Sequence, residues 1–335
     1  MTALSLNTLL VTLICVGSTA WLWYKRYREL RPALRVEKLF LFPIKGLRPV
    51  EDLKEVEVSE KGFKYDRRFV LVSPKEDGAH ECHLAASYPS HSQLRQTIDW
   101  TALTLTITAP SSRSYTVPLT PSTASLTPFT VNLHQSPVPA FDMGDEAAAF
   151  FTEVSEGKET RLMWLDERIS GAKYGRKVLG RISDGKDNAS YMIASSASLD
   201  AFSSALGRPM PIMPLRPNIL VGPAGPGEKL KPWVEDFWGE LRVGKAIIRL
   251  TNNCVRCVSL NIDYETGKRL EGTGLPLQVL SKDRRVDPGA KYSPVFGRYG
   301  FSHDVGSTIA VGDPVQVTKI NKYRSRFGWP GMGTD

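Results

Sequence analysis

The sequence is poor in cysteine, and its first 24 residues carry no charged side chain. Four cysteines (Cys15, Cys82, Cys254 and Cys257) in 335 residues are too few for a disulfide framework and indicate reduced thiols. No Gly-x-Gly-x-x-Gly motif opens a helix after a strand pattern, so the chain has no evident nicotinamide or flavin site of its own. No Lys/Arg run interleaved with aromatic residues occurs beyond residue 35, which argues against nucleic-acid binding.

The uncharged N-terminal segment is expected to anchor the chain in a membrane through residues 7–24. The segment is long enough to cross a hydrocarbon core, and Trp and Tyr at its end match the membrane interface. The basic cluster at 25–35 follows and contributes four of the eight net positive charges. A cleaved signal peptide is the alternative, with 17–20 as its cleavage site, but no positive residues precede the apolar run. By the positive-inside rule the body faces the cytosol.

Beyond the anchor, alternating apolar residues predict many short strands separated by Pro, Gly, Ser and Asp. Clear examples are 69–72, 103–107 and 115–119. Helical patterns are fewer, at 145–151 and at 198–206, the latter ending at Gly207. The length favours about two domains. We therefore expect an α+β, β-rich body with a few packed helices.

Cys254 and Cys257 enclose Arg256 directly after a strand pattern at 246–250. A neighbouring Arg favours the thiolate, which is a soft metal ligand or a nucleophile. Zinc would need two further ligands, which the His-Glu-Cys-His run at 80–83 could supply. A redox dithiol would open a helix, which the polar residues that follow do not favour. Two buried thiols without a chemical role are the remaining interpretation.

Six short motifs occur in one order between about residue 36 and residue 318. They are Phe42-Pro43-Ile44-Lys45-Gly46, Asp66-Arg67-Arg68-Phe69, Arg216-Pro217-Asn218-Ile219, Cys254-Val255-Arg256-Cys257, Pro294-Val295-Phe296-Gly297-Arg298-Tyr299 and Val311-Gly312-Asp313-Pro314-Val315. Together they resemble the MOSC family with its N-terminal β-barrel companion domain. The resemblance implies a MOSC N-terminal β-barrel-like domain (36–160) and a MOSC β-barrel domain (161–320). They follow the transmembrane anchor with its basic flank (1–35) and precede a C-terminal tail (321–335).

The resemblance also implies a molybdenum cofactor, Mo-molybdopterin. Cys257 falls where the family places the thiolate that ligates molybdenum, and Cys254 at a position without that role. The residues implied to hold the anionic pterin are Lys45, Arg67, Asp187, Arg216, Asn218, Arg256 and Tyr299. Lys and Arg neutralise a phosphate, and Asn and Tyr supply oriented hydrogen bonds. Departures from the family pattern, which put the phosphate grip and the substrate range in question, are Gly46 for a hydroxyl residue, Val255 for a serine, Asn188 and Ala189 for a Thr-Ser pair, and Ala86 for an arginine.

With the anchor, the chain resembles the branch of the family that reduces N-hydroxylated substrates such as amidoximes and hydroxylamines. Because the chain lacks a nucleotide fingerprint, its electrons are expected to come from another protein. The resemblance implies that this protein is a b-type cytochrome with its NADH-dependent reductase. It places the protein on the mitochondrial outer membrane, with the endoplasmic reticulum second. Two other functions stay open: a molybdenum cofactor carrier or sulfur-transfer MOSC protein without such turnover, and a zinc-stabilised membrane adaptor.

Overall fold

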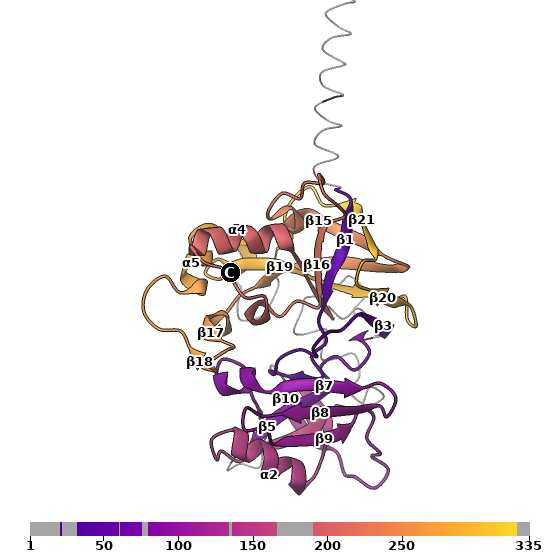
Figure 1. The fold of residues 1–335 in the computed structure, drawn as a ribbon, viewed down its shortest axis with the longest axis vertical. Coiled ribbons are helices and arrows are strands. Elements are labelled where there is room, and N and C mark those ends of the chain that lie inside the picture. The colour runs from indigo at the N-terminus through magenta and orange to yellow at the C-terminus, as the bar shows by residue number, and fades with distance from the viewer. Residues whose placement is uncertain are drawn as a thin grey trace, which may run out of the picture.

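The computed structural model describes residues 21, 32–59, 61–75, 80–133, 136–165 and 190–326. Over these residues the chain is β-rich and forms two stacked halves (Figure 1). The strands are β1 (Leu34–Leu39), β2 (Ile44–Lys45), β3 (Glu55–Ser59), β4 (Gly62–Phe63), β5 (Phe69–Pro74), β6 (His80–Cys82), β7 (Arg95–Asp99), β8 (Thr104–Thr108), β9 (Ser114–Pro118), β10 (Phe129–Leu133), β11 (Ser136–Asp142), β12 (Arg161–Trp164), β13 (Tyr191–Ser195), β14 (Ile219–Pro223), β15 (Trp238–Val243), β16 (Ala246–Val255), β17 (Ile262–Asp263), β18 (Lys268–Arg269), β19 (Val295–Ser302), β20 (Thr308–Ala310) and β21 (Pro314–Ile320).

The helices described are few and short. The α-helices are α2 (Asp145–Val154), α4 (Ser196–Leu206) and α5 (Pro276–Asp283), and the 3-10 turns are η1 (Pro89–Gln93), η2 (Met213–Leu215), η3 (Val234–Phe237), η4 (Val258–Asn261) and η5 (Pro288–Ala290). The two helices expected at 145–151 and 198–206 are therefore confirmed. Ser195 caps the start of α4, because its hydroxyl accepts the backbone N–H of Ser198, and Gly207 caps the end in the left-handed region.

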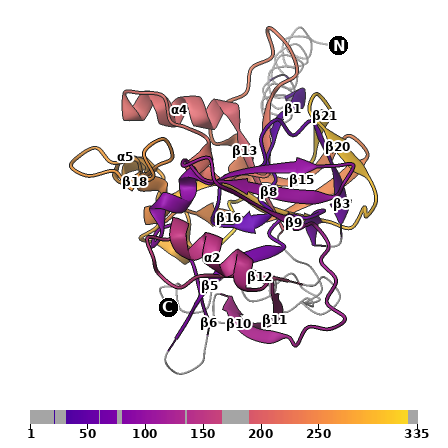
Figure 2. The same ribbon diagram turned by 60° about the horizontal axis from the view of Figure 1, so that its bottom comes forward.

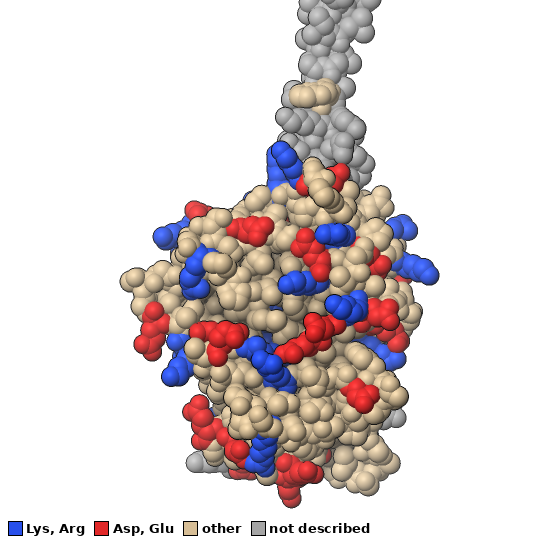
Figure 3. All heavy atoms as spheres, viewed as in Figure 1, with Lys and Arg blue, Asp and Glu red and all other residues tan. Residues whose placement is uncertain are grey.

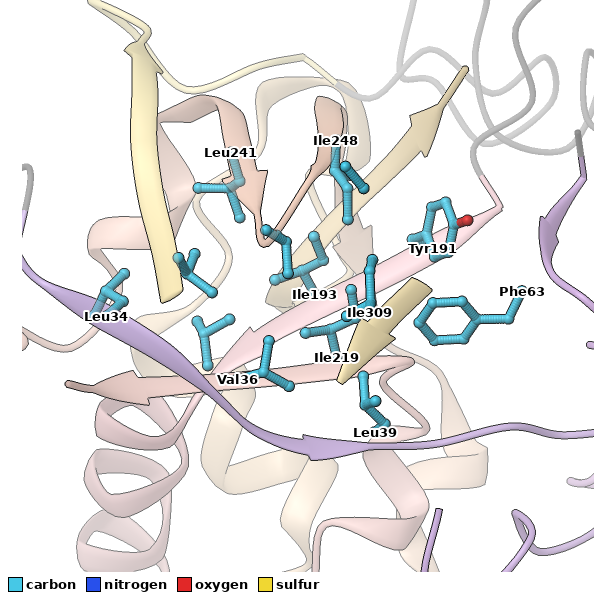
Figure 4. Close-up of a cluster of buried hydrophobic side chains, with 14 of the residues drawn as sticks. Leu34, Val36, Leu39, Phe63, Tyr191, Ile193, Ile219, Leu241, Ile248 and Ile309 are labelled. Carbon is cyan, nitrogen blue, oxygen red and sulfur yellow. The ribbon is translucent and has the colours of Figure 1, made fainter. Parts of the chain in front are cut away.

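A closed seven-stranded barrel forms the C-terminal half, in the order β1-β14-β13-β19-β16-β15-β21. Successive side chains point to opposite faces of a strand, so β1 buries Leu34 and Val36 and leaves Arg35 exposed. Figure 4 shows these two side chains meeting Ile193, Ile219 and others in the barrel interior. β1 lies in this barrel although it comes before the N-terminal half in the chain.

The N-terminal half contains a six-stranded sheet, β12-β11-β10-β6-β5-β2, in which β12 also pairs with β5. A second sheet, β7-β8-β9, and helix α2 share its core. α2 contributes Phe150 and Phe151, whose rings pack edge-to-face with centroids 5.1 Å apart and are buried with Phe69 and Leu105. This confirms the barrel-like N-terminal domain that the sequence predicts.

Side-chain contacts join the two halves at the β17–β18 hairpin, which extends toward the N-terminal half in Figure 1. Arg48 forms an ion pair with Glu265 at 3.2 Å, and the Gln93 amide donates to the Glu265 carbonyl at 2.9 Å. Arg269 donates to the carbonyl of Ala86. β3 also pairs with β20 of the other half. The boundary between the two halves, called the seam below, is therefore formed by residues of both halves.

α4 and α5 contact each other and lie outside the barrel on one side (Figure 2). Phe202 of α4 packs against Phe296 of β19, with centroids 6.1 Å apart. The predicted anchor, residues 7–24, lies outside the described residues except for Trp21. Among the residues that are described, no helix is both long and apolar enough to cross a membrane.

Candidate functional site

The end of β16 places the two thiols in different surroundings. β16 continues through Val255, past the 246–250 predicted, and its register with β19 shifts twice between Leu250 and Val255. Such bulges redirect a strand and are frequent beside active sites. Cys254 is 2% exposed within an apolar cluster, whereas Cys257 is exposed immediately before η4. Of these two thiols, only Cys257 is presented to a ligand from solvent.

Arg256 extends from the same turn into the protein. Its Nη1 donates to Cys254 Sγ at 3.0 Å and its Nη2 to the Pro214 carbonyl at 3.0 Å. Its Nε is buried and has no hydrogen-bond partner among the described residues. A buried donor without an acceptor is costly. Arg256 therefore has one donor available for a bound acceptor.

Arg67 and Arg216 share the ring of Phe42. Their guanidinium carbons lie 5.0 and 4.2 Å from its centroid, within the range of cation–π attraction. Both arginines have left-handed backbones, with φ of 54° and 50°. Non-glycine residues in this region cost about 1–3 kcal/mol and cluster at functional sites. The structure thus holds two strained, charged residues against one aromatic ring.

Further contacts fix Arg216. Its Nη1 donates to the Leu47 carbonyl at 2.6 Å and to the Tyr264 hydroxyl at 3.4 Å. Burial lowers the pKa of Arg216, and the nearby Tyr264 opposes that shift. An arginine remains protonated under such conditions. The site therefore keeps a positive charge in partly dehydrated surroundings.

Asn218 and Asp66 support these arginines from within the protein. Asn218 is 1% exposed, and its Nδ2 donates to Asp66 Oδ2 at 3.1 Å and to the Phe40 carbonyl at 3.2 Å. Its Oδ1 accepts from the Met192 N–H at 3.2 Å and from Arg67 at 3.3 Å. Asp66 also accepts from Arg67. The amide of Asn218 is thus fully engaged in connecting strand segments and orienting Arg67.

Lys45 lies at the N-terminal edge of the site. Its Nζ donates to Cys82 Sγ at 3.4 Å. Burial raises the pKa of the Cys82 thiol, and Lys45 opposes that shift. Gly46, the next residue, has φ of 99°, and a Cβ built there meets no atom within 4 Å. Glycine relieves the backbone here, and the space above it is open.

Tyr299 interacts electrostatically with both Arg256 and Arg67. It is partly buried on β19 among the apolar residues around Cys254. Burial raises the pKa of Tyr299 well above its ordinary value, and Cys254 adds to the shift, while Arg256 and Arg67 oppose it. The phenol therefore stays protonated at neutral pH. Both arginines therefore lie within electrostatic range of the Tyr299 hydroxyl.

The structure thus brings together five of the predicted residues around Phe42 and Cys254, namely Arg67, Arg216, Asn218, Arg256 and Tyr299. Cys257 is close enough to Arg256 to raise its pKa. Lys45 lies in the chain between Phe42 and Leu47, which both contact Arg216, but its own side chain contacts Cys82. Asp187 lies outside the described residues. Sequence reasoning missed Asp66 and Tyr264 as supporting residues, although Asp66 begins a quoted motif. It also passed over Arg68 in that motif, which is only 6% exposed. A guanidinium buried to this degree requires compensation.

The zinc interpretation lacks a ligand set in the described part of the chain, where no three His, Cys, Asp or Glu side chains are grouped to hold a metal ion. His83 is instead buried, bonded to Ser73 Oγ at 2.8 Å and stacked on Tyr88 with centroids 3.7 Å apart. Within the 80–83 run, His83 is therefore part of the core of the N-terminal half, whereas Glu81 is exposed to solvent.

The fold and the thiol-bearing turn define a two-domain β-barrel protein with a cationic site at one seam. The sequence matches the MOSC N-terminal beta barrel domain over residues 33–157 and the MOSC domain over residues 180–316. The chain belongs to the family of MOSC-domain proteins.

Curated relatives match along most of the chain. The human protein named mitochondrial amidoxime reducing component 2 is 28% identical, with 90% of this chain and 89% of that protein covered. The mouse protein named mitochondrial amidoxime-reducing component 1 is 26% identical, with 91% and 88% covered. Among solved structures, YiiM from Geobacillus stearothermophilus covers 39% of this chain and 54% of that chain at 16% identity, with a TM-score of 0.26.

Proposed function

We propose that this protein is a molybdenum-cofactor-dependent oxidoreductase that reduces N-hydroxylated compounds such as amidoximes and hydroxylamines. The observation that carries the proposal is the exposed Cys257 thiol at the edge of a cluster of cationic side chains. Relatives named amidoxime reducing components match about 90% of the chain. Fold alone does not imply function, so the proposal rests on the site.

The residues present fit an anionic, thiolate-bound group. Arg67, Arg216 and Arg256 supply positive charge, and Arg256 Nε lacks an acceptor in the described part of the chain. The space above Gly46, next to Lys45, is open. Fixed guanidinium groups favour bidentate binding of phosphate. A pterin phosphate and a soft metal match this donor set.

Each residue then has a definite task. Lys45, Arg67 and Arg216 neutralise the phosphate, and Arg256 and the protonated Tyr299 donate hydrogen bonds to the heterocycle. Cys257 holds the metal through its sulfur. When bound, the cofactor supplies a metal that changes redox state and accepts an oxygen atom from the substrate. Val258, beside Cys257, is 59% exposed, so a small substrate can approach this turn from solvent.

Electrons are proposed to come from a b-type cytochrome and its NADH-dependent reductase. The absence of a nucleotide fingerprint in the sequence supports this. On the face in Figure 3, basic and acidic side chains are interspersed. Beyond residue 35 the chain still carries 38 Lys and Arg against 34 Asp and Glu. This modest positive excess favours an acidic partner, and we expect an encounter that weakens moderately with added salt.

The predicted anchor at 7–24 and its basic flank support a membrane location with the body facing the cytosol. The relatives' names favour mitochondria, and we propose the outer membrane. Protease added to intact mitochondria should digest the body. Digestion only after the outer membrane is lysed would contradict this orientation.

Elemental analysis of the purified full chain, combined with turnover, tests the function. We expect bound molybdenum, reduction of benzamidoxime with a chemical electron donor, and no turnover with NADH unless the cytochrome and reductase are added. Molybdenum without turnover would indicate a cofactor carrier. Zinc without molybdenum would indicate the membrane adaptor.

A further inference from the structure

Ser259 contacts the thiol proposed to bind the metal. Cys257 Sγ and Ser259 Oγ lie 3.1 Å apart. The turn η4 fixes this geometry, because the Cys257 carbonyl accepts the Leu260 N–H at 3.0 Å and the Ser259 carbonyl accepts the Ile262 N–H. These two hydrogen bonds fix the backbone at both ends of the turn, which carries the sulfur and the hydroxyl side by side.

We propose that Ser259 is a positioning residue that donates a hydrogen bond to the Cys257 thiolate and sets the electron density this sulfur offers to molybdenum. The inference rests on the proposed function. A metal-bound thiolate has no proton, so in this pair only the serine hydroxyl can donate. Hydrogen bonds to a charged acceptor are stronger than neutral ones.

The expected effect is on the redox state of the metal. A donor to a ligand sulfur withdraws charge from it and stabilises the reduced metal, and such bonds are a known determinant of metal–thiolate potentials. Ser259 is half-buried, so water competes only in part for its hydroxyl. The buried thiol Cys254 has a different donor, the Arg256 guanidinium, so Ser259 affects Cys257 alone.

The first measurement is the Mo(VI)/Mo(V) midpoint potential of the purified full chain by redox-poised electron paramagnetic resonance. Ser259→Ala should retain molybdenum and shift the equilibrium about tenfold toward the oxidised metal. For a one-electron couple this corresponds to a midpoint potential about 59 mV lower than that of the parent. Ser259→Thr keeps the hydroxyl and should hold the parental potential. An unchanged potential in Ser259→Ala, or the same shift in Ser259→Thr, would overturn the inference.

A second measurement needs no metal. Metal-free protein is alkylated with iodoacetamide at one fixed pH, and peptide mapping follows Cys257, with Cys257→Ser as the control for assignment. Ser259→Ala should slow the alkylation of Cys257 by about threefold, because losing the donor lowers the thiolate fraction and the greater nucleophilicity of the more basic sulfur offsets only part of that loss. Ser259→Thr should not slow it. A parental rate in Ser259→Ala would refute the contact. If the parental protein binds no molybdenum, the proposed function fails while this measurement still decides the role of Ser259.

Discussion

The two halves of the molecule contribute different chemistry to one site. The N-terminal half provides positive charge through Lys45 and Arg67. The C-terminal barrel provides the exposed thiol Cys257 at a bulged strand end, together with Arg216, Arg256 and Tyr299. Under the proposed function, the N-terminal residues would only bind the cofactor, whereas the barrel would both bind it and supply the thiol that ligates the metal. Variants in each half should therefore fail in different ways.

The largest effect is expected from Cys257→Ser in the barrel. A hard neutral hydroxyl replaces a soft anionic sulfur, so the reduction rate of benzamidoxime should fall by roughly 100-fold or more. The pterin can still be held by the cationic side chains. The reduction rate with a chemical electron donor and the molybdenum content by elemental analysis check this prediction.

Cys254→Ser is the matched control. Cys254 is 2% exposed and faces Arg256, so its loss should leave most of the activity. If both variants are folded and equally inactive, the site is a dithiol or a two-thiol metal centre, and the assignment of molybdenum to Cys257 fails.

Lys45→Met should separate binding from chemistry in the N-terminal half. Loss of one charge-assisted contact to phosphate corresponds to roughly 10–100-fold weaker cofactor binding, while the rate per bound molybdenum stays close to parental. Lys45 is a cleaner choice than Arg67, whose removal would leave the buried Asp66 without its ion pair. Lys64→Met removes a surface charge paired with Glu57 and should retain cofactor. A lower rate per molybdenum in Lys45→Met would contradict the division between the halves.

A smaller effect is expected for Asn253 of β16, which affects the stability of the fold. Asn253 is fully buried, and its Nδ2 donates to Asp287 Oδ2 at 2.7 Å and to the Ser325 carbonyl at 3.0 Å. Asn253→Ala should lower the free energy of unfolding by about 1–3 kcal/mol, because it leaves buried acceptors with fewer donors. Urea denaturation measures this. A parental free energy would show that the bulged strand end does not depend on this contact.

Much of this arrangement could be predicted from the sequence. Alternating apolar residues predicted β5, β8 and β9, and the apolar face at 198–206 with Gly207 at its end predicted α4, because these signals are local. The membership of β1 in the C-terminal barrel could not be predicted, since its partners β14 and β21 are distant in the chain. Ordered motifs indicated the site residues. They did not show that Asn218 faces inward to Asp66 and Arg67, because hydrogen-bond direction depends on tertiary packing.

The smallest effect is a pH dependence located in the N-terminal half. Burial lowers the pKa of His83 from 6.5 to about 3 and that of His91 from 6.5 to about 4. In the unfolded chain both imidazoles take up protons near pH 6.5, whereas in the folded chain they stay neutral until the pH is far lower. The unfolded state therefore binds more protons between these values, so the free energy of unfolding is greatest above about pH 6.5 and falls as the pH drops through 4.

His91→Phe tests this dependence, because it keeps an aromatic ring beside Tyr88, with which His91 stacks at 5.1 Å, and removes one titrating group. The loss of unfolding free energy between about pH 7 and pH 4.5 should shrink by on the order of 1 kcal/mol, although the lost bond to Ser155 lowers stability at every pH. Equal slopes for the His91→Phe variant and the parent would mean that the stacked imidazoles do not control acid stability.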